Sequence, residues 1–167
     1  RGNEARAAAM AEMAALMHRL RTDPQLGCEL EGASSEALDD AQRANLREMR
    51  RQWNSATALP EALVERRSLA TSRCEHAWRS QRQANDWAGF LPNLREVLEV
   101  TRECAQRLAD HSGLAPYDAL MDQFEPGMTS AVVRRLFGDV RQWLPGLIQQ
   151  VMERQATRTL LVPQGPF

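Results

Sequence analysis

The sequence predicts an all-α protein, and three observations lead to that prediction. Apolar residues recur at spacings of three and four along most of the chain, as in RAAAMAEMAALMHRL, which places them on one face of a helix. No stretch of about four to eight residues alternates apolar and polar side chains with β-branched character, so we expect no strand. Proline and glycine divide the chain into segments of helical length. We therefore expect about six helices in an antiparallel bundle, with residues 1–167 as a single helical domain.

The first part of the chain predicts three helices. Residues 3–21 form the first, and residues 25–31 form a short second helix after the break at TDP. A third helix begins at a cap on Ser34 or Ser35, because SSEALDD places acids at the positive N-terminal end, and it runs to about Trp53.

Two longer helices follow. The fourth begins at Pro60, which is tolerated in a first turn, and runs to about Ala84. Its expected inner face consists of Leu63, Ala70, Cys74, Ala77 and Trp78. The fifth is capped by Asp86, and Pro92 falls early enough in it to separate a first turn at little cost.

The stretch YDALMDQFEPGMTSAVVRRLF predicts a short helical turn, a stop and a new helix. Residues 117–124 form the turn, EPG ends it, and Thr129 caps the last helix, which Pro145 should kink. We expect the apolar positions of the last two long helices to be mostly buried. These positions are Leu94, Leu98, Leu108, Val133, Leu136, Val140 and Leu144.

Composition places the protein among ordinary globular proteins of the cytoplasm. The formal net charge of −1 gives no reason to expect nucleic acid or an anionic membrane. No apolar run approaches the roughly 20 residues of a membrane span. Cys28, Cys74 and Cys104 are an odd number at irregular spacing, which favours reduced thiols over a disulfide framework.

The histidines do not form a metal-binding pattern. A zinc site on a helix needs ligands at i and i+4, and neither His18, His76 nor His111 has a second histidine at that spacing. Cys74 and His76 are two residues apart and would point in opposite directions from a helix. We therefore expect no metal ligand among these residues.

Two charged stripes allow more than one interpretation. Asp118, Asp122 and Glu125 would share a helix face, where they could bind a hard cation or supply paired carboxylates for acid–base work. A solvated acidic face that meets arginines is the favoured interpretation. The second stripe consists of Arg43, Arg47, Arg50 and Arg51, with Trp53 nearby. It resembles a nucleic-acid patch, but Glu48 interrupts it, so a solvated face or intramolecular ion pairs are favoured.

The remaining large aromatic side chains are expected in the core. Trp78, Trp87 and Trp143 lie on helical apolar faces, which is more typical of core packing than of a ligand site. The chain has no glycine-rich phosphate loop and no CxxC motif. The residues alone thus predict a helical domain without naming a function.

Several stretches in order resemble one protein family. They are EARAAAMAEMAALMHRLRTDPQLG, NLREMRRQWNSATALPEALVERRSLATSRCEHAWRSQRQANDWAGFLPNLREVLE and PYDALMDQFEPGMTSAVVRRLF. Together they are similar to the N-terminal part of the carboxypeptidase Taq family of metallocarboxypeptidases, whose fold is almost wholly helical. The resemblance implies an enzyme that removes C-terminal residues from peptides with zinc, or another divalent metal, as cofactor. It also implies that these helices form a wall and a lid of a substrate cleft.

The chemistry of that family is not carried by this chain. Family members are about three times longer and use a His-Glu-x-x-His helix, which does not occur in the 167 residues. No catalytic or metal-binding residue is therefore carried over, and substrate-binding residues stay unknown. The implied partners are a missing C-terminal catalytic half and, for the parent enzyme, a peptide substrate.

A free-standing helical protein-interaction module is the alternative. The two interpretations differ in the surface they predict. Both ends of the chain look cut, because RGNEARAAAM lacks an initiator methionine and LVPQGPF is a loop. A piece of a larger enzyme should expose an apolar patch and self-associate into a homo-oligomer. The candidate residues are Met10, Met13, Met17, Leu160, Leu161 and Val162.

Overall fold

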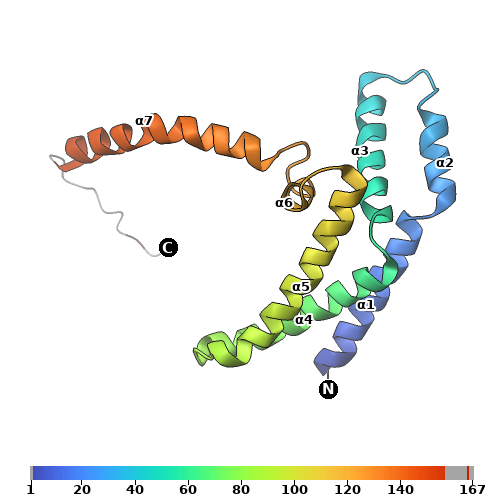
Figure 1. Ribbon diagram of the computed structural model, residues 1–167, viewed down its shortest axis with the longest axis horizontal. Coiled ribbons are helices and arrows are strands. Elements are labelled where there is room, and N and C mark those ends of the chain that lie inside the picture. The colour runs from blue at the N-terminus through green and yellow to red at the C-terminus, as the bar shows by residue number, and fades with distance from the viewer. Residues whose placement is uncertain (1, 157–164, 166–167) are drawn as a thin grey trace.

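The protein is described by a computed structural model that covers residues 2–156 and 165. The helices are α1 (Gly2–Arg21), α2 (Pro24–Ala33), α3 (Asp40–Thr57), α4 (Glu61–Gln83), α5 (Trp87–Ser112), α6 (Pro116–Met121) and α7 (Ser130–Ala156). Residues 2–156 contain no strand, and Figure 1 shows the helices and the connections between them. The all-α prediction is confirmed, with one helix more than the six expected because α6 is a helix in its own right.

Helix α1 packs on α4 through alanines. Ala7, Ala11 and Ala15 are buried, and their small side chains let the two helix backbones approach closely. The longer apolar side chains of α1 remain exposed, with Met10 at 55% and Met13 at 54%. The exposure predicted for the α1 methionines is therefore confirmed, whereas Leu160, Leu161 and Val162 lie outside the described residues.

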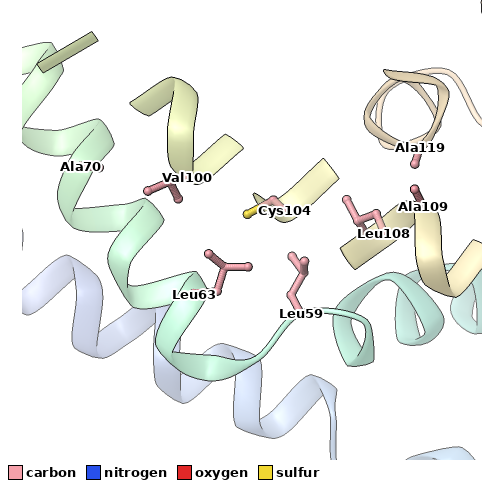
Figure 2. Packing of buried hydrophobic residues seen from close by; sticks show 8 residues of the cluster. All are labelled: Leu59, Leu63, Ala70, Val100, Cys104, Leu108, Ala109 and Ala119. Atoms are coloured by element: carbon pink, nitrogen blue, oxygen red, sulfur yellow. The ribbon is translucent and has the colours of Figure 1, made fainter. Parts of the chain in front are cut away.

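The hydrophobic core lies where α4, α5 and α6 meet (Figure 2). Its buried members are Leu59, Leu63, Ala70, Val100, Cys104, Leu108, Ala109 and Ala119. Among the described residues, Val100 and Cys104 have the largest side chains that are almost fully enclosed. They lie about one turn apart on α5. The core therefore fixes the angle between α4 and α5, and Ala119 joins α6 to it.

The predicted inner faces are correct only in part. Of the seven apolar positions expected to be buried, Leu108 is buried and Leu94, Val133 and Val140 are half-buried, but Leu98, Leu136 and Leu144 are exposed. Leu98 lies two residues before Val100, which faces the core, so its side chain points to the opposite side of α5. On α4, Leu63 and Ala70 are buried as predicted.

The tryptophan prediction was wrong. Trp78, Trp87 and Trp143 are all exposed. Trp78 carries the guanidinium of Arg82 on its ring, with 5.0 Å between the guanidinium carbon and the ring centroid. The exposed fractions of Trp78, Trp87 and Trp143 are 42%, 60% and 55% respectively, so none of the three belongs to the core.

The start of α3 also differs from the prediction. Its N-cap is Asp39, whose Oδ1 accepts a hydrogen bond from the Gln42 backbone N at 2.8 Å, while the Gln42 Oε1 accepts one from the Asp39 N at 2.9 Å. Ser34 and Ser35 instead close α2, because their hydroxyl groups donate to carbonyl oxygens of that helix. The reciprocal capping box of Asp39 and Gln42 satisfies two backbone N–H groups, whereas a lone serine cap satisfies one.

Helix α7 leaves the rest of the molecule (Figure 1). The corner between α6 and α7 follows the predicted stop, with Gly127 at φ +80° and Thr129 Oγ1 accepting from the Val132 backbone N at 3.4 Å. The helix then continues through Pro145. None of its described residues is buried, and residues 141–156 are all exposed.

Candidate functional site

The acidic stripe organises the corner between α6 and α7. Asp118 Oδ1 accepts a hydrogen bond from the backbone N of Ser130, the first residue of α7, at 2.8 Å. Asp122 Oδ1 accepts one from the Gly127 backbone N, also at 2.8 Å. Both carboxylates are therefore engaged with the backbone of the turn, and Asp118 places its negative charge at the N-terminal end of α7. Glu125 is exposed.

Arg51 connects this corner to α3. Its Nη2 and Nε donate to the two carboxylate oxygens of Glu48 at 2.6 and 2.9 Å. Its Nη1 donates to the Asp122 carbonyl oxygen at 3.2 Å and lies 3.7 Å from the Asp122 carboxylate. The hydrogen bond from Arg51, helped by one from Gln52, lowers the pKa of Glu48 to about 2. Donating these hydrogen bonds to the Glu48 carboxylate raises the pKa of Arg51.

The other members of the arginine stripe hold the α2–α3 hairpin. Arg50 Nη2 donates to the Leu30 carbonyl oxygen at 3.0 Å. Arg43 Nη2 donates to Asp40 at 2.7 Å, and its Nη1 donates to the Leu38 carbonyl oxygen. Together with Arg47 they line a hollow of about 730 Å³ beside this hairpin. Intramolecular contacts thus account for Arg43, Arg50 and Arg51, which favours the ion-pair interpretation over a nucleic-acid patch.

The histidines lie on three different helices. His18 is on α1, His76 on α4 and His111 on α5. Within residues 2–156 and 165, no three His, Cys, Asp or Glu side chains are grouped so that they could hold a metal ion. Burial raises the pKa of the Cys74 thiol and that of the Cys104 thiol. Cys104 is the more fully enclosed of the two. Cys104 is part of the core and is inaccessible to a reagent.

A groove of about 930 Å³ runs between α1 and α4. One wall carries Ala7 and Met10, and the other carries Val64, Arg67 and His76. The groove lies where the alanine contact between the two helices opens toward solvent. Sequence reasoning missed this groove, because its walls come from helices that are far apart along the chain. In the part of the chain that the structure describes, no helix has the length and apolar character to cross a membrane.

Comparison with known sequences gives one consistent family. The sequence profile of the carboxypeptidase Taq (M32) metallopeptidase family matches residues 1–166. Thermostable carboxypeptidase 1 of Thermus thermophilus is 37% identical over 164 residues, which cover 91% of this chain and 32% of the relative. A thermostable carboxypeptidase 1 of Pyrococcus furiosus is 28% identical over 149 residues and is covered to 30%. The chain spans about a third of the length of the curated relatives that it matches.

The solved structures agree with the sequence comparison. Metallocarboxypeptidase 1 of Trypanosoma cruzi superposes with a TM-score of 0.80 at 45% identity, over 99% of this chain and 34% of that one. The superposition therefore extends over almost the entire helical framework, α7 included. The chain belongs to the carboxypeptidase Taq family of metallopeptidases.

Proposed function

We propose that this chain supplies the N-terminal helical part of a metal-dependent carboxypeptidase that removes C-terminal residues from peptides. The observation that carries the proposal is the family match over residues 1–166 by a chain that spans only about a third of its relatives. The described part of the chain contributes helices, a hydrophobic core and the hydrogen-bonded corner between α6 and α7. It contains no group of side chains suited to a metal ion.

The metal of such an enzyme would be bound elsewhere. The family is one of metallopeptidases, and zinc is the ion we propose for the complete enzyme, with another divalent ion as the alternative. His18, His76 and His111 lie on separate helices and do not fit a zinc site. We therefore assign the ligands, the general base and the residues that bind the substrate carboxylate to the part of the enzyme that lies outside this chain.

The structural role proposed for this chain is that of a wall and lid beside the substrate. Two features support this role: α4 and α5 pack together around Val100 and Cys104, and α7 extends away from them. Such a wall would admit an extended peptide and exclude a folded protein. The C-terminal catalytic part is the proposed partner.

A fusion enzyme tests the proposal. Residues 1–167 replace the corresponding third of the Thermus thermophilus carboxypeptidase, to which they are 37% identical. The fusion should release the C-terminal residue of a short peptide and leave the same peptide with an amidated C-terminus uncut. The control is the relative with that third deleted, which should be inactive. A folded, metal-loaded fusion that releases nothing would refute the proposal and favour the free-standing interaction module.

A further inference from the structure

Helix α7 carries an apolar stripe that is largely exposed among residues 2–156. Six residues at spacings of three and four form its centre: Val133, Leu136, Val140, Leu144, Leu147 and Val151. Larger side chains flank it, with Phe137 exposed to 63% and Trp143 to 55%. The opposite side of the helix is polar and includes Arg135, Asp139, Gln142 and Gln149. A helix of this pattern is typical of one that packs its apolar face against another element.

The direction of α7 is fixed by polar contacts at its base. Asp118 binds the Ser130 backbone N, and Asp122 binds the Gly127 backbone N. Arg51 holds Asp122 from the side of α3. These contacts orient the start of the helix without covering its apolar stripe, which extends over a helix of 27 residues. The apolar stripe is therefore exposed even though the start of its helix is held in a defined direction.

The length of the relatives identifies what would cover the stripe. This chain spans 32% of the Thermus thermophilus relative, so the greater part of that protein has no counterpart here. Under the proposed function that part follows α7 in sequence, and a covalent connection keeps it at high local concentration near the helix. Apolar patches larger than a few hundred Å² on a single chain mark interaction surfaces.

We propose that the apolar stripe of α7 is the docking surface for the C-terminal catalytic part of the enzyme. This inference rests on the proposed function and specifies which surface joins the two parts. The catalytic part would bury Leu144, Leu147 and Val151, while Gln142 and Gln149 stay in solvent. In the isolated chain Leu136 and these three stripe residues are exposed.

Thiol labelling in the fusion enzyme tests the docking surface. Leu147→Cys lies in the stripe, and the matched control Gln142→Cys lies on the polar side of the same helix; both positions are exposed in this chain. Peptide mapping by mass spectrometry separates their labelling from that of the exposed Cys28. In the isolated chain both thiols should react at rates within about threefold of each other. In the fusion, Leu147→Cys should react at least about tenfold more slowly, and Gln142→Cys should be unchanged.

A second measurement needs no substitution. Amide hydrogen exchange of residues 141–156 in the fusion should be at least about tenfold slower than in the isolated chain. Equal labelling and equal exchange in the two proteins would overturn the docking surface. So would protection of Leu147→Cys in the fusion that appears only as the protein concentration rises, because the cover would then be a second copy.

The activity of the unsubstituted fusion separates the two proposals. An active fusion with an unprotected α7 would refute the docking surface and leave the proposed function standing. An inactive fusion with a protected α7 would refute the proposed function and support the docking surface.

Discussion

The carboxylate of Asp118 receives the backbone N–H of Ser130, with 2.8 Å between Oδ1 and N, and this hydrogen bond joins α6 to the first residue of α7. The two residues are twelve positions apart, on either side of the turn at Gly127. Asp118 thus acts as an N-terminal cap that comes from a neighbouring helix. Two acids of a stripe that could be a cation site in the sequence, Asp118 and Asp122, instead accept backbone hydrogen bonds that orient the start of α7.

Removing the Asp118 carboxylate should loosen the first turn of α7. Asp118→Ala leaves the Ser130 N–H without its acceptor and removes a favourable charge, a loss of about 1 kcal/mol. Amide exchange over residues 130–137 should then become about fivefold faster, and Asp118→Asn should show a smaller effect. The control is Asp139→Ala, an exposed position on the same helix, which should leave exchange unchanged. Equal rates for Asp118→Ala and the parent would show that this cap does not hold α7.

Acid should weaken the ion pair between Glu48 and Arg51 on α3. The pKa of Glu48 is about 2 in the folded protein against 4.5 ordinarily, chiefly because Arg51 donates hydrogen bonds to its carboxylate. A folded pKa below the unfolded one stabilises the protein above the unfolded pKa, and that contribution is lost as the pH falls through the folded pKa. Glu48 should therefore add stability at pH 5 and above and lose it between pH 4.5 and about 2.

The measurement is urea unfolding of the parent and of Glu48→Gln from pH 2 to 7. Glu48→Gln should be less stable at pH 7, and its stability should approach that of the parent near pH 2. Arg51→Gln, which removes the partner, should bring the same convergence. A constant difference between parent and Glu48→Gln over the whole pH range would contradict this assignment.

Aspartate should distinguish the two sides of α5. Val100→Asp places a charge in the core, where Val100 is 1% exposed, and should unfold the chain because an unpaired buried charge costs several kcal/mol. Leu98→Asp is the matched control, since Leu98 is 44% exposed and points away from the core. Its thermal midpoint should stay within a few degrees of the parent. The measurement is the thermal midpoint of each variant, followed by circular dichroism. A folded Val100→Asp would show that the core lies elsewhere.

A methyl group at Gly27 should disturb the α2–α3 hairpin. A Cβ built on Gly27 would lie 2.6 Å from Cζ2 of Trp53, so the indole would have to move. Gly27→Ala should cost about 1–3 kcal/mol as an overpacked contact. Gly32→Ala, in the same helix but with nothing within 4 Å of the new Cβ, should be neutral or stabilising by up to about 1 kcal/mol. The order of the two unfolding free energies in urea checks this, and the reverse order would be incompatible with the packing of Trp53.

Local signals in the sequence were sufficient for most helix boundaries. Asp86 caps α5 as predicted, with its Oδ1 accepting from the Gly89 backbone N at 2.9 Å. The stop before Gly127 and the cap at Thr129 were also predicted correctly, because each depends only on neighbouring residues. The cap of α3 was missed because Ser34 and Asp39 are both good capping residues, and the reciprocal bond with Gln42 decides between them.

Burial and the candidate site depended on contacts that periodicity does not contain. Leu98 and Val100 both belong to apolar faces of α5, and only the position of α4 shows which face is inside. Leu144 lies on a regular apolar stripe, yet within residues 2–156 its side chain remains exposed. The role of Asp118 was missed because its partner is a backbone N–H brought near by a turn. That residues 1–167 fold as one domain stays a prediction.

The most direct test of the central claim compares the isolated chain with the fusion enzyme for zinc content and peptide cleavage. If this chain supplies structure and the remaining part supplies chemistry, the isolated chain should retain no stoichiometric zinc after dialysis and should release no C-terminal residue from a test peptide. The fusion should retain zinc and release the residue. One zinc ion per isolated chain after dialysis, or C-terminal release by the isolated chain, would contradict the account.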